Sequence, residues 1–430
     1  MPLAGFTVEK YRSFVRPAKV ELRPLTLLFG YNSAGKSALL RTLPLLAASM
    51  DPNAPGPLAL GSEVARGATF ADIKSHQVAG SIISFSLEWR KPWGLISRTE
   101  LRIFDVEDRK EQVVERIRAF DHANSLVFEA EWDPDNKAPS GPGLSYTVRF
   151  PPVMDEPEPQ RIEFAGLLPW KLSDSPGPPE AGYFWSLRDQ MNDLRTSVHW
   201  IGSLRAMPPR RAYYIGRPKS MGPTGKEAAA ILAYDKRGQG SILRRVSAWY
   251  EGATRHSLDI SEEAGRFSVV LSPLKGAPVN INIVDTGEGM AQVLPVLVLG
   301  VQALHGELGA DAVLAIEHPE LHLHPAAERE LAGFFCELAR QEKAPRTLIE
   351  THSENFLLRV QLAIVSGEVP REHVLVYWVR ELEDGSSEVE PITFDELGRP
   401  EGNKWPPGVF SEDVEQARQI VLKRRSRSPT

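Results

Sequence analysis

The stretch "LTLLFGYNSAGKSALL", residues 25–40, determines the fold class that we predict for this chain. Its central part, residues 30–37, fits the pattern G-x-x-x-x-G-K-[ST] of a phosphate-binding loop without mismatch. An apolar run that suits a buried strand precedes the loop, and helical sequence follows it. A chance glycine-rich turn would not need these neighbours. We therefore predict a strand, a phosphate loop and a helix whose N-terminus faces anions.

Each residue type in this loop has a physical role toward ATP. The glycines allow backbone N–H groups to face the phosphates, Lys36 reaches the β- and γ-phosphates, and the Ser37 hydroxyl binds Mg²⁺. The residues that we expect around the bound nucleotide are Gly30, Asn32, Ser33, Ala34, Gly35, Lys36, Ser37 and Ala38.

The bulk composition excludes several classes of protein. The formal net charge of -6 argues against a general polyanion binder, although the tail at residues 423–430 is basic. One cysteine cannot form a disulfide framework, which fits a reducing compartment. The first residues lack a signal-peptide pattern, and the apolar stretch at residues 293–304 is too short to span a bilayer. We expect a cytoplasmic protein without a membrane partner.

Two later apolar runs end in polar side chains. "VLAIE" ends at Glu317, which we expect to hold Mg²⁺ directly or through water, and "LIETHSE" places Glu350 and His352 at a strand tip. Ligands of open parallel sheets bind at the carboxyl ends of the strands, so these ends should converge on the phosphate loop. A γ-phosphate-sensing role for His352 is favoured over a purely structural one.

A fourth segment, "DTGEGMAQVLPVLVLG" from Asp285, has two close glycines before an apolar helix. Gly287 and Gly289 could present backbone amides to a phosphate at the helix N-terminus. An ordinary glycine-rich helix start explains the local pattern equally well.

Taken in this order, the four segments resemble those of the ABC-class ATPases of the SMC, RecF and OLD type. The resemblance covers residues 1–90 and 280–380. "IGSLRAMPPRR", "YYIGRPKSMGPTGKEAAAIL" and "GNKWPPGVFSEDVEQA" further resemble a bacterial group of ATPases that carry a small C-terminal domain of unassigned function with a WPPGVF box.

The resemblance implies a homodimer with ATP between the subunits. Gly287 and Gly289 would face the γ-phosphate held by the partner's Lys36. Gln77 would touch Mg²⁺ and the attacking water, although an exposed polar glutamine is the favoured alternative. The implied fold is α/β, a P-loop NTPase of ABC type with a mixed or parallel sheet flanked by helices, an antiparallel β subdomain and a helical insertion.

The expected domain division has four parts. Residues 1–90 and 281–380 form the N-terminal and C-terminal parts of the ATPase domain. Residues 91–280 hold the β subdomain and a helical insertion, including a proline-rich loop or flexible insertion at 151–180. Residues 381–430 form a small C-terminal domain and the basic tail.

His318 is the main departure from the family, since that position usually carries the catalytic glutamate. A neutral imidazole at His318 could accept a proton near pH 7, or it could only orient water. Loss of a positioned general base costs about 10²- to 10⁴-fold in rate, so we predict slow hydrolysis, with Glu350 a better substitute acid than Glu320. A metal site made by the histidines of "EHPELHLH" is disfavoured, because it would need distant third and fourth ligands.

These expectations support an ATP-driven dimerisation switch that controls an effector encoded nearby or grips DNA, with anti-phage defence as one setting. An OLD-like DNA-repair or nuclease-associated ATPase and a scaffold with little catalysis are the alternatives. Residues 205–219 mix arginines with tyrosines and could track DNA, but structural packing is favoured.

Overall fold

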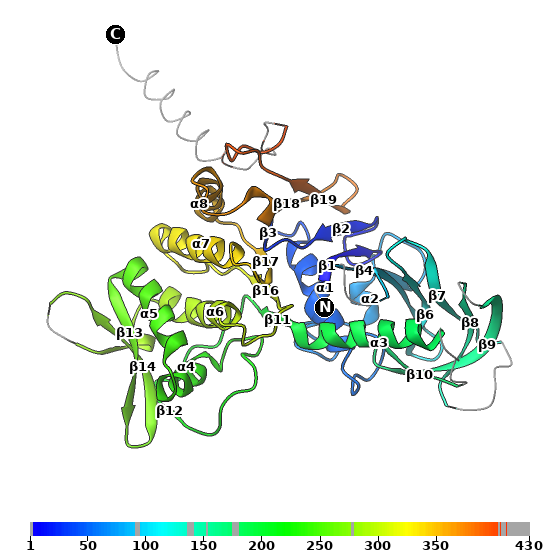
Figure 1. The fold of residues 1–430 in the computed structure, drawn as a ribbon, viewed down its shortest axis with the longest axis horizontal. Helices are drawn as coiled ribbons and strands as arrows, with labels where there is room; N and C mark the ends of the chain where they lie inside the picture. Colours follow the sequence, from blue (N-terminus) through cyan, green and yellow to red (C-terminus); the bar gives the residue numbers. More distant parts are fainter. Residues whose placement is uncertain are drawn as a thin grey trace, which may run out of the picture.

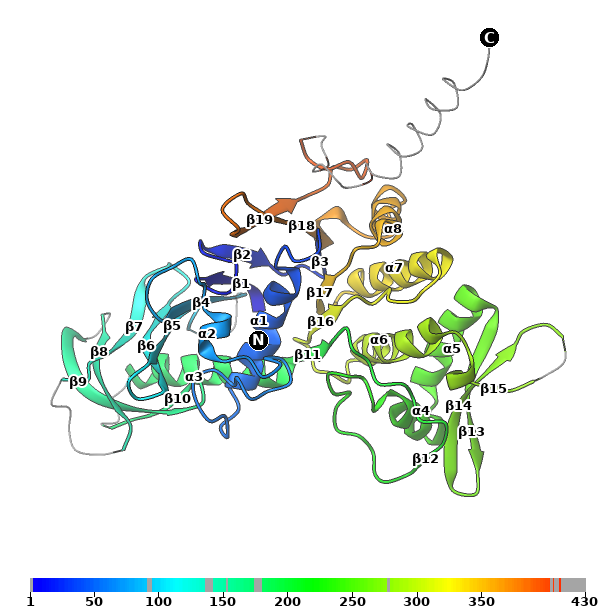
Figure 2. The same cartoon turned by 180° about the vertical axis from the view of Figure 1, so that it is seen from behind.

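The computed structural model describes residues 3–90, 95–135, 142–151, 154–173, 180–276 and 279–402, together with Trp405 and Phe410. A central sheet lies between a large antiparallel sheet on one side and a small sheet with two helices on the other (Figure 1). The view from behind shows the same three-part arrangement (Figure 2). Most of the WPPGVF box and the basic tail lie outside the described residues.

The central sheet has the strand order β11-β16-β17-β3-β18-β19. The first five strands are parallel, and β19 is antiparallel to β18. Their bounds are β11 (Val198–Ile201), β16 (Val313–Glu317), β17 (Arg346–Glu350), β3 (Leu25–Gly30), β18 (Val374–Glu381) and β19 (Ser387–Ile392). Strands β3 and β16 are buried along their whole length, as continuous apolar runs in a sheet covered on both faces should be.

The two faces of the central sheet pack against different cores. Leu25, Leu27 and Phe29 of β3 join the core built with α6 (Glu288–Leu304), α7 (Pro325–Ala339) and α8 (Glu354–Val365). Leu28 instead joins the core built with α1 (Lys36–Ser49), α3 (Glu180–Ser197) and the large sheet. This alternation is the two-residue period of a strand, and it confirms the predicted α/β class with a mixed sheet flanked by helices.

The large sheet is antiparallel and has the order β10-β9-β8-β7-β6-β5-β4-β1-β2. The expected antiparallel subdomain is thus present, and it also recruits the first two strands of the chain. Their bounds are β1 (Leu3–Glu9), β2 (Ala18–Glu21), β4 (Ile82–Trp89), β5 (Arg98–Val106), β6 (Glu111–Phe120), β7 (Leu126–Trp132), β8 (Leu144–Phe150), β9 (Met154–Ala165) and β10 (Leu168–Leu172).

The proline-rich segment predicted as a loop or flexible insertion is instead partly a hairpin of β9 and β10. Strand β10 pairs only with residues 162–165 of β9, so Pro157 and Pro159 lie where β9 has β8 on one side alone. Proline is tolerated on such an edge, because its missing N–H leaves no unpaired donor there.

A third sheet, which the sequence did not predict, has the order β12-β14-β13, and β15 also pairs with β14. Helices α4 and α5 pack against it. Its elements are β12 (Ala212–Tyr213), α4 (Ala228–Arg237), α5 (Ser241–Thr254), β13 (His256–Glu263), β14 (Arg266–Pro273) and β15 (Ile281–Asn282). Among the described residues, no helix combines the length and apolar character that crossing a bilayer requires.

The four-part domain division stays a prediction. The first predicted domain boundary falls between residues 90 and 91. Strands β4 and β5 lie on either side of this boundary, and residues Ile82 to Glu88 of β4 pair with β5. The sheet is therefore continuous across that point.

Candidate functional site

The phosphate loop and the ends of β16 and β17 meet at one cavity of about 550 Å³. Parallel strands place their carboxyl ends on the same edge, and the register sets Glu317 beside Glu350 and Glu350 beside Leu28. The residues that line the cavity are Arg12, Ser13, Asn32, Ser33, Gly35, Lys36, Ser37, Ala38, Asp72, His76, Gln77, His318, Glu350, His352 and Gly385. Of the predicted site residues, Gly30, Ala34, Gly287, Gly289 and Glu317 are outside this lining.

The two loop glycines occupy positions that a side chain would disturb. Gly30 has φ +149°, and a Cβ there would lie 2.1 Å from the Val379 carbonyl oxygen. Gly35, which caps α1, has φ +102°, and a Cβ added there would lie 3.0 Å from the side chains of Phe14 and Ser13. Both backbones lie in the left-handed region that favours glycine, so the loop conformation itself explains these two residues.

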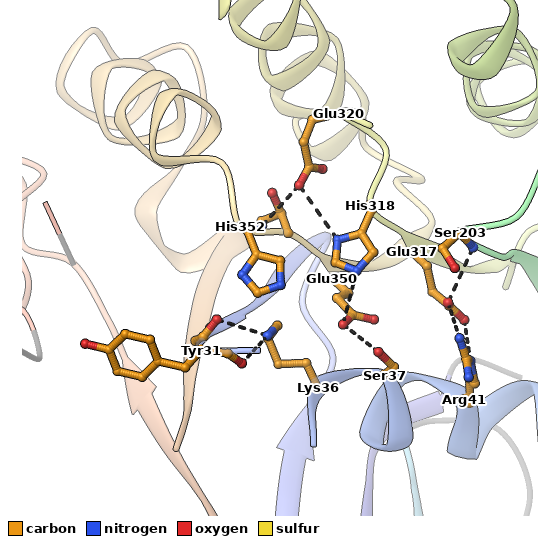
Figure 3. Close-up of polar contacts among 12 residues, drawn as sticks. Tyr31, Lys36, Ser37, Arg41, Ser203, Glu317, His318, Glu320, Glu350 and His352 are labelled. Atoms are coloured by element: carbon orange, nitrogen blue, oxygen red, sulfur yellow. Dashed lines mark hydrogen bonds and ion pairs between the residues drawn. The ribbon is translucent and has the colours of Figure 1, made fainter. Parts of the chain in front are cut away.

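Lys36 lies folded over the loop. Its Nζ donates to the Gly30 carbonyl at 3.0 Å and to the Tyr31 carbonyl at 2.7 Å (Figure 3). Burial lowers the pKa of Lys36 to about 8, against the opposing effect of Glu350 and Glu320. An anionic ligand in the loop would therefore gain a partly desolvated ammonium group as its partner.

Glu350 is the carboxylate next to Ser37. The Ser37 hydroxyl donates to Glu350 Oε1 at 2.7 Å, and the glutamate is only 2% exposed. Glu350 Oε2 is buried with no hydrogen-bond partner among the described residues. Burial raises the pKa of Glu350, while the charge on His318 and the hydrogen bond from Ser37 oppose that shift. A hydroxyl and a carboxylate with a free oxygen are donors that suit Mg²⁺.

Glu317 has a different set of partners. Arg41 of α1 donates to both of its carboxylate oxygens, at 2.7 and 2.5 Å, and Trp200 Nε1 donates to Oε1 at 3.0 Å. Burial opposes ionisation, but these contacts hold the pKa of Glu317 below its usual value. The expected metal acid is thus engaged by Arg41, because β17 intervenes between β3 and β16 and places Glu350 nearer the loop. Direct metal binding by Glu317 stays a prediction, and it requires the Arg41 pair to open.

His318 directly follows the end of β16 and faces two acids. Its Nε2 lies 3.5 Å from Glu350 Oε1, and its Nδ1 lies 3.9 Å from Glu320 Oε1 (Figure 3). The His318 ring stacks on His352 with ring centroids 5.2 Å apart and an interplanar angle of 11°. The backbone of His318 is left-handed, with φ 44°, and its N–H donates to the Glu350 carbonyl at 2.8 Å.

The two stacked histidines have opposite tendencies to bind protons. Burial acts to lower the pKa of His318, but Glu320 and Glu350 outweigh it and raise the pKa above its usual value. Loss of solvation, followed by the charges on Lys36 and His318, lowers the pKa of His352 to about 4. His352 is therefore neutral near pH 7, whereas the two acids favour protonation of His318 relative to a free histidine.

Gln77 lines the same cavity, as the family resemblance implied. Its Nε2 donates to the Asp384 carbonyl at 2.8 Å, in the turn between β18 and β19. A role of Gln77 toward a metal or water stays a prediction.

The two glycines before α6 differ in their surroundings. Gly287 is the N-cap of α6, and a Cβ added there would meet no atom within 4 Å. At Gly289 a Cβ would lie 2.3 Å from the His322 carbonyl oxygen. Packing within the chain therefore explains the glycine at position 289. It does not explain the glycine at position 287.

Two arginines that support the site were not recognised from sequence. Arg41 pairs with Glu317 as described. Arg205 is 7% exposed and donates through Nη2 to the Glu317 and His318 carbonyls and through Nη1 to the Gln292 carbonyl at 3.3 Å. Arg41 follows Ser37 by four residues, so the sequence could have placed both on the same face of the predicted helix. For Arg205, the sequence showed only that it belongs to a basic segment.

Comparison with known proteins supports the ATPase resemblance. Residues 179–359 match the model of a family described as "AAA domain, putative AbiEii toxin, Type IV TA system". This segment includes the glycines before α6 and the ends of β16 and β17, so the expected ATPase resemblance is confirmed there. No curated protein matches the chain.

Solved structures with similar arrangements include SMC head domains. One is the SMC head bound to the C-winged helix domain of ScpA, at 12% identity and TM-score 0.45, with 91% of this chain and 98% of that chain covered. The SMC head from Thermotoga maritima has 11% identity and TM-score 0.38, covering 91% and 99%. The Pyrococcus furiosus SMC head with an extended coiled coil, bound to a ScpA domain, has 11% identity and TM-score 0.44, covering 99% of each chain.

Proposed function

We propose that this chain binds Mg²⁺–ATP in the cavity at the phosphate loop, hydrolyses it slowly and uses it to control dimerisation. The observation that carries the proposal is the meeting of Lys36, Ser37, His318, Glu350 and His352 around one cavity at the carboxyl edge of the parallel sheet. Phosphate-loop NTPases place their lysine, hydroxyl and acidic side chains in this way.

The nucleotide phosphates would take the place of the carbonyl groups that now accept from Lys36. The loop amides and the N-terminus of α1 would add favourable dipoles. The Ser37 hydroxyl and the Glu350 carboxylate would hold Mg²⁺, which neutralises phosphate charge when bound. The buried, unpartnered Glu350 Oε2 is the observation that fits this ion.

Slow hydrolysis is expected because His318 stands where the catalytic glutamate is usual. Glu320 and Glu350 raise the pKa of His318. The protonated form of His318 cannot accept a proton from water, although it can stabilise negative charge on phosphate. His352, neutral and exposed at the cavity, can share a hydrogen bond with a phosphate oxygen. The pair therefore suits a long-lived ATP-bound state better than rapid turnover.

Dimerisation would complete the nucleotide site through Gly287. This glycine caps a 17-residue helix and is not part of the cavity lining in its own chain. A helix N-terminus with an open approach favours an anion, so a γ-phosphate held by the partner's Lys36 is its proposed ligand. A head-to-tail pair of this kind has two equivalent sites.

Control of an effector protein encoded nearby, in the cytoplasm, is the favoured downstream role. The family description, with its reference to a toxin and a toxin–antitoxin system, supports a defence setting. DNA binding through residues 205–219 gains less support. Arg210 forms a bidentate pair with Asp285, at 2.8 and 2.5 Å, and Arg211 lies 3.6 Å from Glu263, so nearby acids offset both charges. An OLD-like repair ATPase and a nucleotide-binding scaffold remain as second candidates.

The test is ATP binding by Lys36→Ala, measured with a fluorescent ATP analogue in the presence of Mg²⁺. We expect the wild type to bind and the variant to lose at least about tenfold in affinity, because one charge-assisted phosphate contact is removed. Lys275→Ala, which changes an exposed lysine just after β14, is the matched control and should bind as the wild type does. Equal binding by Lys36→Ala would overturn the proposal.

A further inference from the structure

Three side chains at the end of the cavity form a potential metal-binding cluster. His318, Glu350 and His352 each offer one ligand atom, and these atoms all lie within 4.8 Å of one another. The closest pair with a known distance is His318 Nε2 and Glu350 Oε1, at 3.5 Å. Ligands about 2.1 Å from one ion lie about 3 Å apart at right angles and about 4.2 Å apart when opposite. The three atoms would therefore close slightly, and the stacked rings would rotate so that their nitrogens face a shared ion.

The carboxylate of this cluster has an unsatisfied oxygen that could accept a cation. Glu350 is 2% exposed, Ser37 occupies its Oε1, and its Oε2 has no hydrogen-bond partner among the described residues. A buried carboxylate oxygen without a donor is costly. A bound cation would remove that cost, as an ordered water molecule also could.

Glu320 supports the two histidines from behind. Its Oε1 accepts from the His352 backbone N–H at 3.1 Å and lies 3.9 Å from His318 Nδ1. Histidines that bind metals commonly direct their second ring nitrogen at a carboxylate, which fixes the ring. The left-handed backbone of His318, with φ 44°, is a further constraint that holds this side chain beside Glu350.

We propose that His318, Glu350 and His352 bind a divalent transition-metal ion of borderline softness, in preference to Mg²⁺. Two imidazoles and one carboxylate suit Fe²⁺, Co²⁺ or Zn²⁺, whereas Mg²⁺ prefers oxygen ligands throughout. Three protein ligands leave positions open for water or a phosphate oxygen. A metal site at the "EHPELHLH" segment needs ligands from elsewhere in the chain. Glu350 at the end of β17 and His352 just after it supply them.

This inference goes beyond nucleotide binding, because it concerns the cavity without nucleotide. Glu350 is shared, so a transition metal held by the histidines and Mg²⁺ held with Ser37 would compete for the same carboxylate. We therefore expect the metal to be bound in nucleotide-free protein and to resist displacement by Mg²⁺ alone.

The experiment uses the full chain, stripped with a chelator and dialysed against Co²⁺ without nucleotide. We expect one Co²⁺ per chain, retained in a roughly hundredfold excess of Mg²⁺, because nitrogen ligands favour the softer ion. His318→Gln and His352→Gln should each weaken Co²⁺ binding at least about tenfold, since each removes a ligand. His76→Gln, which changes another histidine of the same cavity outside the cluster, is the matched control and should leave binding unchanged.

X-ray absorption of the Co²⁺-loaded wild type gives a readout that does not depend on variant folding. Imidazole scattering around the ion supports the proposal, and an all-oxygen shell overturns it. Loss of Co²⁺ to equimolar Mg²⁺, or equal binding by both histidine variants and the wild type, also overturns it. Lys36→Ala separates this proposal from the proposed function: it should retain Co²⁺ while losing ATP, and each failure can occur without the other.

Discussion

Arg41 of α1 and Glu317 at the end of β16 form a largely buried ion pair. Glu317 is 1% exposed at its side chain, and Arg41 covers both of its oxygens. Arg41→Ala would leave a buried carboxylate without its cation, and we expect a loss of about 3–5 kcal/mol in the free energy of unfolding. Urea unfolding followed by circular dichroism measures this loss. Arg66→Ala is the control, because Arg66 is half exposed and 3.9 Å away, and it should cost less than about 1 kcal/mol.

A double variant tests the reason for that loss. Arg41→Ala combined with Glu317→Gln removes both charges, so it should be more stable than Arg41→Ala alone. If the single variant costs no more than Arg66→Ala, the buried pair is not what stabilises this region.

His318→Glu tests whether the missing carboxylate limits hydrolysis. A glutamate there could accept a proton from water, and restoring a positioned base should raise the single-turnover rate by about 10²-fold or more. The measurement is single-turnover ATP hydrolysis with enzyme in excess, and His76→Gln serves as a control for changes in the same cavity. An unchanged rate in His318→Glu would show that another step or residue limits turnover.

At the scale of elements, two glycines at the start of α6 have different surroundings. Gly289→Ala would place a Cβ 2.3 Å from the His322 carbonyl oxygen, so α6 and the loop after β16 must move apart. We expect a loss of about 1–3 kcal/mol by thermal or urea unfolding, as for other overpacked sites. Gly287→Ala meets no atom, and the change of the glycine N-cap to alanine should cost less than about 1 kcal/mol. Because alanine normally favours helices over glycine, a stabilised Gly289→Ala would contradict the packing explanation.

The candidate site also illustrates what the sequence could predict. The loop at Gly30 to Ser37 and the strand ends with Glu317, Glu350 and His352 were all recognisable from local pattern, because phosphate binding needs fixed residue types at fixed spacing. The partners of Glu317 were not, since they depend on β17 lying between β3 and β16. Because of that strand order, the acid beside Ser37 is Glu350. No local sequence pattern reveals the order of the strands.

For the whole molecule, the α/β class followed from the alternation of strands and helices, but the sheets did not follow in full. β1 and β2 do not pair with β3, the strand before the phosphate loop, but belong to the large antiparallel sheet. The small sheet around β14 was also not expected. Alternating apolar residues show that a strand has a buried face, yet they do not show which distant strand pairs with it. Long-range pairing was therefore the part that sequence reasoning missed.

The proposed head-to-tail dimer can be tested by mixing two inactive chains. Lys36→Ala removes the phosphate contact, and Gly287→Leu places a bulky side chain where the structure leaves open space, so it should fold but block the partner's phosphate. Random mixing in equal amounts makes half of the dimers mixed, and each mixed dimer has one intact site of two. We therefore expect hydrolysis to recover to about one quarter of the wild-type rate in a symmetric dimer. Chains that recover no activity on mixing, although each still dimerises, would indicate that Gly287 serves the nucleotide of its own chain.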